Sequence, residues 1–339
     1  MVLFWIAIWG AGCMSDSRWE IPAEDVELND HWRPVDVRAL TRALVPEAET
    51  AWPQWKAETG PFGVHYVEEI LRIGAHDEAK TAEALAGFTS NDEIRTIDEA
   101  IDSISGAPNF LPSQLDELKH AFNRFRFFFP KEATPQVHCM NSGFNHAVYP
   151  TPDALGIGLE WYLGSQHPIT QSLPPHLFPQ YMRDRMDPAF LVSSAFRGWL
   201  LVHFSSSWYF TNRCADEMIF WGKMLFIMEK CMPTMDKQLL LDWSKEDWSW
   251  AQENEQAVWL ELQPQRELFN TNRMEFGRWF NEGPFTRAAG IPQESPDRLG
   301  AYMGWRMVSD FMRKNPEATL QDLLIITDPT PIIKAYRPK

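Results

Sequence analysis

The sequence has little cysteine, and what it has does not indicate a disulfide framework. Four of the 339 residues are cysteines: Cys13, Cys139, Cys214 and Cys231. Three of them follow Cys13, so at least one of these three is unpaired within the chain. If residues 214–231 form one helix, Cys214 and Cys231 lie roughly 25 Å apart at 1.5 Å per residue, which is too far for a bond. We therefore expect a fold that is held without disulfides.

Long hydrophobic runs are also missing. Past residue 13, no apolar run comes near the roughly 20 residues that span a bilayer as a helix. The most hydrophobic later stretch, residues 218–232, is interrupted by Lys223, Glu229 and Lys230, which indicates a buried helix of a folded domain. With 45% hydrophobic and 13% aromatic residues, the chain is expected to bury a substantial core rather than stay disordered.

Basic residues are scarce relative to acidic ones. The chain has 31 lysines and arginines against 46 aspartates and glutamates, a formal net charge of -15. Such a surface repels phosphate backbones, so we expect no nucleic-acid partner. It also argues against a general electrostatic attraction to anionic lipids.

The motifs of common enzyme classes are absent. No His is followed by Glu, so there is no H-E-x-x-H zinc motif, and we find no C-x-x-C pair, G-x-S-x-G elbow, P-loop or Rossmann fingerprint. His138 and Cys139 are neighbours in an expected strand, so their side chains point to opposite faces and cannot share a metal ion. Arg197 and Glu217 are candidates for a buried ion pair, for which a structural role is favoured. We expect no catalytic residue, no metal site and no cofactor, and hence a protein that is not an enzyme.

What the sequence does have begins with "MVLFWIAIWGAGCMSDS". The first twelve residues carry no charged side chain; they are too few to cross a membrane as a helix but match the apolar region of a signal peptide. Ala11 and Gly12, directly before Cys13, resemble the bacterial lipobox, in which small residues precede a cysteine that is lipidated and becomes the first residue after cleavage. We predict lipid attachment at Cys13; a buried N-terminal strand is the alternative. Such signals normally start with Lys or Arg, so either the true start lies upstream of Met1 or this signal is minimal.

The rest of the chain divides into a short tether and one domain. Residues 1–12 are expected to be the signal peptide, residues 13–30 an acidic, polar tether, and residues 31–339 a single globular domain. Several acyl chains on one residue give lasting membrane attachment. The expected location is therefore the cell envelope, most naturally on the periplasmic side, with the membrane as a partner through the N-terminal lipid.

Helix signals dominate the domain. Apolar spacing and capping residues predict helices over residues 90–104, with Ser90 in a capping box with Glu93, and over 111–129, 187–204, 216–232, 244–262, 295–315 and 319–324. Ser244, Ser295 and Thr319 are the expected N-caps of the last three. Strand signals cluster in the middle, at 134–140, 145–150 and 154–164. The fold class is therefore α+β, a mostly helical domain with a small central sheet.

Several stretches together resemble one known family. They are "GPFGVHYVEEILRIG", "LGIGLEWYLGSQHP", "FPQYMRDRMDPAFLVSSAFRGWL", "DEMIFWGKMLFIMEKCMP", "ESPDRLGAYMGWRMVSDFMRKNPEATLQDLL" and "IIKAYRPK". In this order, over roughly residues 31–339, they are similar to the GldB family, gliding motility lipoproteins of Bacteroidetes-type bacteria. The lipobox falls where that family has one.

The resemblance implies a lipid-anchored envelope protein that supports gliding, with other gliding or secretion proteins as partners. It also implies a distant similarity to zincin-type peptidases, whose metal-binding helix would correspond to residues 187–204. Arg197, Gly198 and Trp199 stand there in place of ligands, and Trp221 precedes Gly222 in the next helix, so a degenerate zincin-like arrangement is expected. A non-enzymatic scaffold or stabiliser is the favoured function. An unconventional zinc metallopeptidase and a binding module for peptidoglycan or exported polypeptide are the alternatives.

Overall fold

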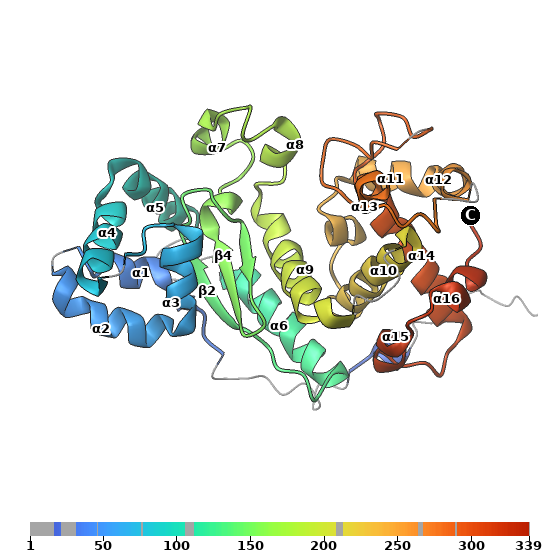
Figure 1. The fold of residues 1–339 in the computed structure, drawn as a ribbon, viewed down its shortest axis with the longest axis horizontal. Helices are drawn as coiled ribbons and strands as arrows, with labels where there is room; N and C mark the ends of the chain where they lie inside the picture. The colour runs from blue at the N-terminus through green and yellow to red at the C-terminus, as the bar shows by residue number, and fades with distance from the viewer. Residues whose placement is uncertain are drawn as a thin grey trace, which may run out of the picture.

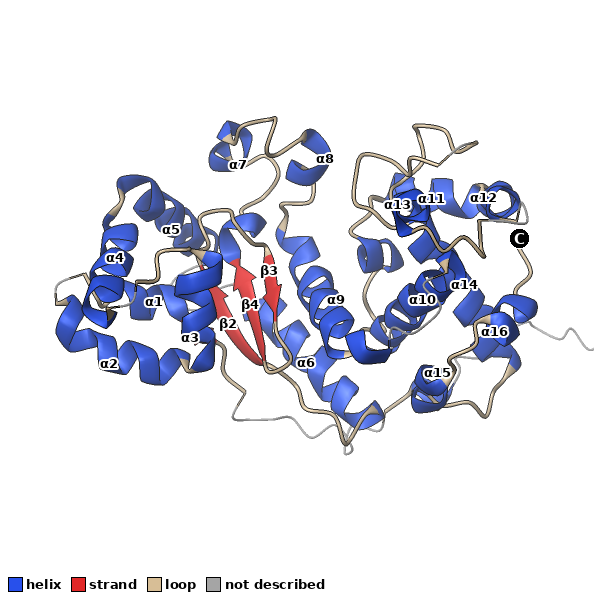
Figure 2. Ribbon diagram, in the orientation of Figure 1, coloured by secondary structure: helices blue, strands red, loops and turns tan. Residues whose placement is uncertain are grey.

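The computed structural model describes residues 17–21, 32–45, 47–75, 77–105, 112–207, 213–263, 267–288 and 290–338. A small sheet lies between two groups of helices (Figures 1 and 2). The first helices of the chain cover one side of the sheet. The helix Pro112–Phe128 and the helices that follow the sheet in the chain cover the other side and extend well beyond it. The fold is therefore α+β and mostly helical, as the sequence predicts.

The first group of helices has its own hydrophobic core. It comprises α1 (Val37–Arg42), α2 (Ala48–Thr59), α3 (Pro61–His65), a π-helical turn (Tyr66–Ile70) and α4 (Glu78–Ser90). The next helix, α5 (Asp92–Ser105), packs beside α4 but buries its Ile101 in the larger core. Trp55, Phe62 and Tyr66 are buried there together with Met140 and Ala154 from the sheet. This smaller core attaches the N-terminal helices to one face of the sheet.

The sheet has four strands in the order β1-β2-β4-β3. The strands are β1 (Val35–Asp36), β2 (Gln136–Met140), β3 (Val148–Pro150) and β4 (Ala154–Gly158). β1, β2 and β4 run parallel, whereas β3 is antiparallel to β4 and forms one edge. His138 stacks on Phe62 of the smaller core while Cys139 belongs to the larger one, so the prediction that they face opposite sides is confirmed.

The larger core is built by four long helices. They are α6 (Pro112–Phe128), α9 (Leu191–His203), α10 (Cys214–Cys231) and α14 (Leu299–Lys314). α10 and α14 cross at glycines: a Cβ on Gly222 would lie 2.2 Å from the carbonyl oxygen of Gly304. Only glycine permits so close an approach of two backbones. Cys214 and Cys231 fall at opposite ends of α10, and the three described cysteines are free and buried.

Short elements complete the fold. They are η1 (Ser17–Trp19), η4 (Leu159–Tyr162), α7 (Pro168–Ser172), α8 (Gln180–Arg183), η5 (Pro188–Phe190), η6 (Ser205–Ser207), η7 (Lys237–Leu241), α11 (Lys245–Glu253), α12 (Glu255–Leu262), α13 (Arg273–Phe276), η8 (Gly277–Trp279), α15 (Leu320–Ile325) and α16 (Thr330–Ala335). Ser244 and Thr319 cap α11 and α15 as predicted, each in a reciprocal pair of hydrogen bonds with the aspartate three residues later. The helix expected over 244–262 is instead two helices, α11 and α12, that meet at Asn254.

Two predicted helix starts are wrong for local reasons. Ser90 is the last residue of α4, where its hydroxyl donates to the carbonyl of Ala86, and Asn91 caps α5 through its side-chain oxygen. Ser295 does not cap α14, because that helix begins only at Leu299, after Arg298 in a left-handed conformation (φ 54°). The residue that precedes the helix is Asn91, directly after Ser90, in the first case and Arg298, three positions after Ser295, in the second.

Candidate functional site

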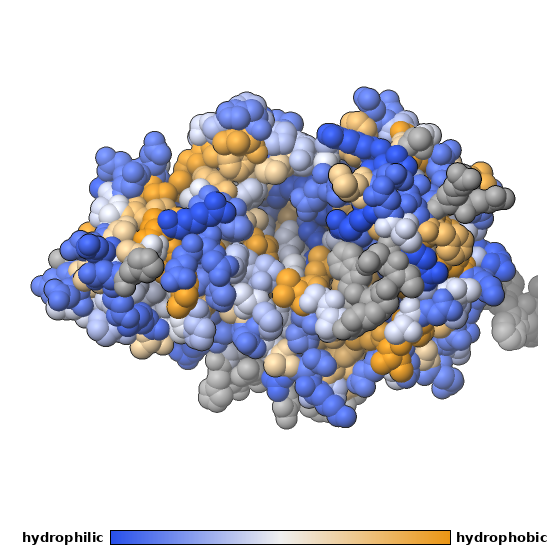
Figure 3. Space-filling model, in the orientation of Figure 1, coloured by the Kyte–Doolittle hydropathy of each residue, from blue (hydrophilic) through white to orange (hydrophobic). Residues whose placement is uncertain are grey.

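A cleft of about 330 Å³, lined by both apolar and charged side chains, lies beside the free edge of the sheet. Its walls come from β3, η4, α8, α9 and α10 and include Val148, Tyr162, Arg185, Arg197, Trp221 and Asp242. Figure 3 shows the molecule hollowed between the side of α7 and α8 and the side of α11 to α13, with mainly hydrophilic residues on the α11 to α13 side and hydrophobic residues among those on the other. We refer to this feature as the cleft.

α9 positions one wall of the cleft through its helical spacing. Ser194, Arg197, Gly198 and Leu201 line the cleft, and their spacing of three and four residues puts them on one face of the helix. The opposite face carries Trp199 and its apolar neighbours into the larger core. Gly198 lets α9 approach the sheet edge, since a Cβ there would lie 3.0 Å from Val148 Cγ1.

The central contact of the cleft is an ion pair between Arg197 and Asp242. Arg197 Nη1 donates to Asp242 Oδ1 at 3.1 Å, and Nη2 donates to Oδ2. The hydroxyls of Ser193 and Ser194 also donate to Asp242, each at 3.1 Å. Burial alone would raise the pKa of Asp242, but the guanidinium groups of Arg197, Arg298 and Arg185 hold it below its usual value.

A second buried carboxylate, Asp297, extends this charge network. It accepts from Arg185 at 2.9 Å, from the indole of Trp243 at 2.9 Å and from the backbone of Gly283 at 3.0 Å. Arg298 Nε donates to Asp297 Oδ1 at 3.2 Å, and Nη1 of the same guanidinium lies 3.9 Å from Asp242 Oδ2. Against the effect of burial, Arg298 and Arg185 hold the pKa of Asp297 low. The network therefore pairs cations and carboxylates throughout the wall.

A third buried carboxylate, Glu160, also acts on Tyr162 through its charge, and no cation among the described residues forms an ion pair with it. Its Oε1 accepts from the backbone N–H of Ser142 at 2.9 Å, from that of Phe144 at 3.0 Å and from the Ser142 hydroxyl. Burial raises the pKa of Glu160 to about 7, against the lowering effect of these hydrogen bonds. This carboxyl group thus titrates near neutral pH, unlike Asp242 and Asp297.

Unusual backbone conformations gather at these two charged sites. Within the described ranges, four non-glycine residues have positive φ: Arg72, Phe144, Asp242 and Arg298. Three of the four hold or neighbour the buried carboxylates. Such conformations cost free energy and cluster where a structure fixes a functional surface.

The sheet edge offers free backbone groups to the cleft. Gly158 donates to the carbonyl of Ala147 at 2.9 Å, and Thr151 donates to that of Ala154 at 2.7 Å. Because hydrogen-bonded pairs alternate in an antiparallel ladder, the N–H and C=O of Val148 and the C=O of Pro150 point away from β4. Ala147 and Val148 both line the cleft, so this edge borders it.

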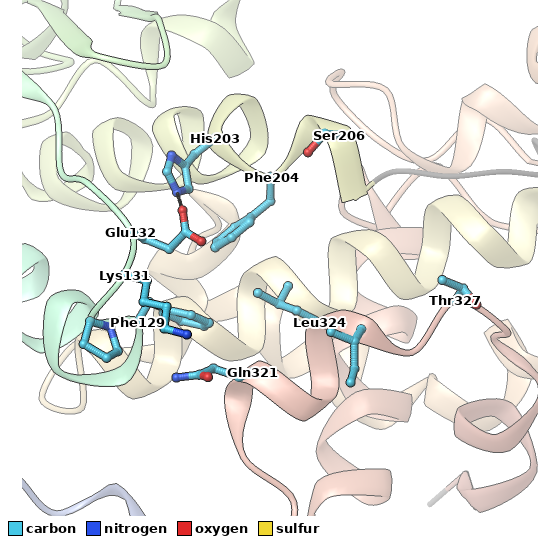
Figure 4. A pocket seen from close by; sticks show the side chains of 11 residues that line it. Phe129, Lys131, Glu132, His203, Phe204, Ser206, Gln321, Leu324 and Thr327 are labelled. Atoms are coloured by element: carbon cyan, nitrogen blue, oxygen red, sulfur yellow. Dashed lines mark hydrogen bonds and ion pairs between the residues drawn. The ribbon is translucent and has the colours of Figure 1, made fainter.

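A second cavity, of about 590 Å³, lies where the C-terminal ends of α6 and α9 meet α15 (Figure 4). His203 Nε2 is 2.9 Å from Glu132 Oε2 there, and the rings of Phe129 and Phe204 form much of the wall. The Glu132 side chain is 44% exposed, whereas the side chains of Arg197 and Asp242 in the cleft are each 7% exposed. The cleft therefore holds the more firmly positioned charged groups and is the candidate site.

The expected pairing of Arg197 with Glu217 is wrong. Arg197 pairs with Asp242, whereas Glu217 accepts from Arg273 at 3.0 and 2.9 Å. The two residues sit on helices that pack together, but each finds a partner on a third segment. No sequence pattern singled out Asp242 or Asp297, because each meets its partners only through the fold.

The residues that stand where the resemblance to zincins would place metal ligands fall only partly in the cleft. Arg197, Gly198 and Trp221 line the cleft, while Trp199 is fully buried. Across the described part of the chain, no cluster of three or more His, Cys, Asp or Glu side chains is placed to hold a metal ion. Burial lowers the pKa of His138 to about 4 and raises that of Cys139 to about 12.

The predicted signal peptide and the predicted lipid site Cys13 lie outside the described residues. Among the helices that are described, none combines the length and the apolarity that a bilayer crossing requires. Lipid attachment therefore stays a prediction from the sequence.

Comparison with known proteins identifies the family. The family model described as gliding motility protein GldB matches residues 17–338, which is nearly the whole chain and includes every element of the cleft. No curated protein and no solved structure matches the chain. The chain therefore belongs to the family of gliding motility protein GldB.

Proposed function

We propose that this gliding motility protein is a lipid-anchored scaffold of the cell envelope that supports the motility machinery and its associated secretion machinery without catalysing a reaction. The observation that carries the proposal is the charge network of the cleft. Arg197, Asp242, Asp297 and their partners are engaged with one another. A general acid or base needs a pKa near the working pH and must exchange its proton. Carboxylates with lowered pKa values inside a hydrogen-bonded network suit a structural surface better. Glu160 has a pKa of about 7, but its side chain is fully buried and does not line the cleft.

The envelope location rests on the lipobox before Cys13. A strain that carries only Cys13→Ala should not incorporate labelled fatty acid into the protein and should not spread on agar. Ser15→Ala, which leaves the lipidated residue in place, is the matched control and should do both. Wild-type labelling of Cys13→Ala would contradict lipidation, and normal spreading of a strain without the protein would contradict a role in gliding.

The absence of catalysis is a separate prediction. Metal analysis of the purified protein tests the metallopeptidase alternative directly. Zinc well below one equivalent is expected, and one tightly bound equivalent would contradict the scaffold proposal.

The free edge of β3 favours a second candidate function, the binding of an extended segment of an exported polypeptide. An added strand would pair with the backbone groups of Val148 and Pro150, and the cleft would receive its side chains. Strand addition depends on main-chain hydrogen bonds, so its test is to remove an outward donor. Proline is tolerated on an edge strand where its missing N–H faces away from the sheet.

Val148→Pro removes the outward N–H, and Val148→Thr keeps it with a side chain of similar shape. If strand addition supports gliding, the proline variant should lose spreading while both variants keep the thermal unfolding midpoint of the parent. Equal spreading of the two variants would remove this candidate function.

A further inference from the structure

The N-terminal segment, residues 17–21, is attached to the domain at one defined place. The Trp19 ring meets Phe128 at 6.1 Å and Phe226 at 5.8 Å, both edge to face. Arg124 Nη2 donates to the carbonyl of Trp19 at 2.8 Å, and Lys230 Nζ lies 5.5 Å from the ring. Aromatic packing and a charged donor together hold this segment against α6 and α10.

Arg18 adds a second attachment at the end of α14. Its guanidinium donates to the carbonyls of Met312 at 3.3 Å, Asn315 at 3.2 Å and Pro316 at 2.6 Å. The last carbonyls of a helix lack partners within the helix and carry its negative dipole end, so a cation is favoured there. The segment is thus fixed by two neighbouring residues on two different elements.

The distance along the chain from this attachment to Cys13 is short. Residues 14–16 separate Cys13 from Ser17, and four steps of at most about 3.6 Å allow a reach of about 14 Å. A lipid on Cys13 would therefore bring the bilayer close to the face where Trp19 is bound. Residues 20–30 do not lengthen this reach, because they come after the attachment.

That face presents apolar side chains to solvent. The Phe127 ring follows Phe128 at 5.5 Å and is 40% exposed, which continues the aromatic row from Trp19. Ile325 on α15 is 75% exposed. Gln321 of α15 donates to the carbonyl of Phe128 at 2.9 Å, so the ends of α6 and α15 lie together. Figure 1 shows both on the side of the molecule opposite α8, a wall of the cleft.

The backbone around Ile325 is held in place. The buried Lys223 Nζ donates to the carbonyls of Leu324 at 3.3 Å and Ile326 at 2.5 Å. Ile325 is thus outward because its flanking carbonyls are tied inward. Its exposure is a fixed property of the end of α15.

We propose that the face formed by Trp19, Phe127 and Ile325 rests on the lipid bilayer and that the cleft is thereby turned away from the membrane. We refer to the face formed by Trp19, Phe127 and Ile325 as the membrane face. This inference rests on the proposed lipidation of Cys13. With a net charge of -15, the protein gains little from anionic headgroups, so the acyl chains supply the affinity and the apolar residues set the orientation. A zwitterionic phosphatidylethanolamine surface is the fitting partner.

The test uses the full-length lipidated protein on phosphatidylethanolamine vesicles that contain brominated lipid as a quencher. A fluorophore is attached at Phe127→Cys, at Ile325→Cys or, as the matched control, at Met274→Cys on α13, which is 96% exposed. Cys139, Cys214 and Cys231 are buried and should not react. Quenching at positions 127 and 325 is expected to exceed that at 274 by about threefold or more, because the quencher lies within the bilayer.

Three outcomes separate the inference from its premise. If the protein does not float with the vesicles, lipid anchoring itself is wrong. If it floats but all three labels are quenched equally, anchoring stands and the membrane face is wrong. Trp19→Ala in the labelled proteins should leave flotation unchanged but abolish the difference between positions 127 and 274. A retained difference would show that the bound N-terminal segment does not set the orientation.

Discussion

Asp242 and Glu160 are both buried carboxylates near Tyr162, yet their surroundings differ in kind. Asp242 is held by arginines, and its pKa is lowered despite burial. Glu160 is held by N–H and O–H donors, with no ion-pair partner in the part of the chain that the structure describes, and its pKa is raised to about 7. Besides burial itself, both raise the pKa of Tyr162 through their charge.

The difference shows that neighbours, and not burial alone, decide the charge of an interior acid. A carboxylate removed from water recovers its hydration energy only if counter-charges replace it. The arginine network does so on one wall of the cleft, which is therefore charged and rigid at any ordinary pH. The hydrogen bonds that Glu160 accepts from Ser142 and Phe144 replace its hydration only in part. We therefore expect the stability of the segment that carries η4 to depend on pH.

The largest effect on stability should come from breaking the ion pairs of Asp242. Asp242→Asn leaves Arg197 and Arg298 facing a neutral amide in a buried site, which typically costs about 3–5 kcal/mol of unfolding free energy. Urea unfolding of the purified domain measures this loss. Ser194→Ala is the control, because it removes one hydrogen bond to Asp242 and should cost about 1 kcal/mol. Similar midpoints for the two variants would mean that the ion pair adds nothing beyond an ordinary hydrogen bond.

The next largest effect on stability should come from Glu160 and should depend on pH. The native pKa of Glu160, about 7, lies above the ordinary 4.5, so the native state keeps a proton that the unfolded state loses. Wild-type stability attributable to this group is therefore full below about pH 4.5 and falls as pH rises to about 7, by roughly 3 kcal/mol in total.

Glu160→Gln should remove that fall, since an amide oxygen can still accept from Ser142 and Phe144 but never ionises. Unfolding free energies measured from pH 4 to 8 should show the variant gaining on the wild type only as pH rises. A constant difference across this range would contradict a raised pKa. Asp242→Asn supplies the opposite case, with a loss that persists at pH 8.

These two sites also mark what could be predicted from the sequence. The helices around Arg197 and Trp221 and the strand residues His138 and Cys139 follow from apolar periodicity, which burial enforces over many residues. Helix starts were less secure, because Ser90 and Ser295 have the right chemistry but another residue occupies the cap. A single hydrogen bond is too small a free energy to fix a boundary against tertiary packing.

The partners within the cleft could not be predicted for a different reason. Arg197 and Asp242 are 45 positions apart, and Asp242 reaches the pair only from a left-handed turn after η7. Neither periodicity nor a short motif encodes such a contact. Glu217 looked equally suitable as a partner in the sequence, and only the positions of η7 and α13 decide between the two acids.

The smallest effect should distinguish the two carboxylates, Glu160 and Asp242, most sharply. The Ser142 hydroxyl donates to Glu160 and lowers its pKa, whereas the Ser193 hydroxyl donates to Asp242, whose pKa the arginines already hold down. Ser142→Ala and Ser193→Ala should each cost about 1 kcal/mol. Only Ser142→Ala should also shift the upper end of the pH window, because the native pKa of Glu160 rises further and stability keeps falling above pH 7. If Ser193→Ala moved that window equally, the contrast between a paired and an unpaired carboxylate would not describe this cleft.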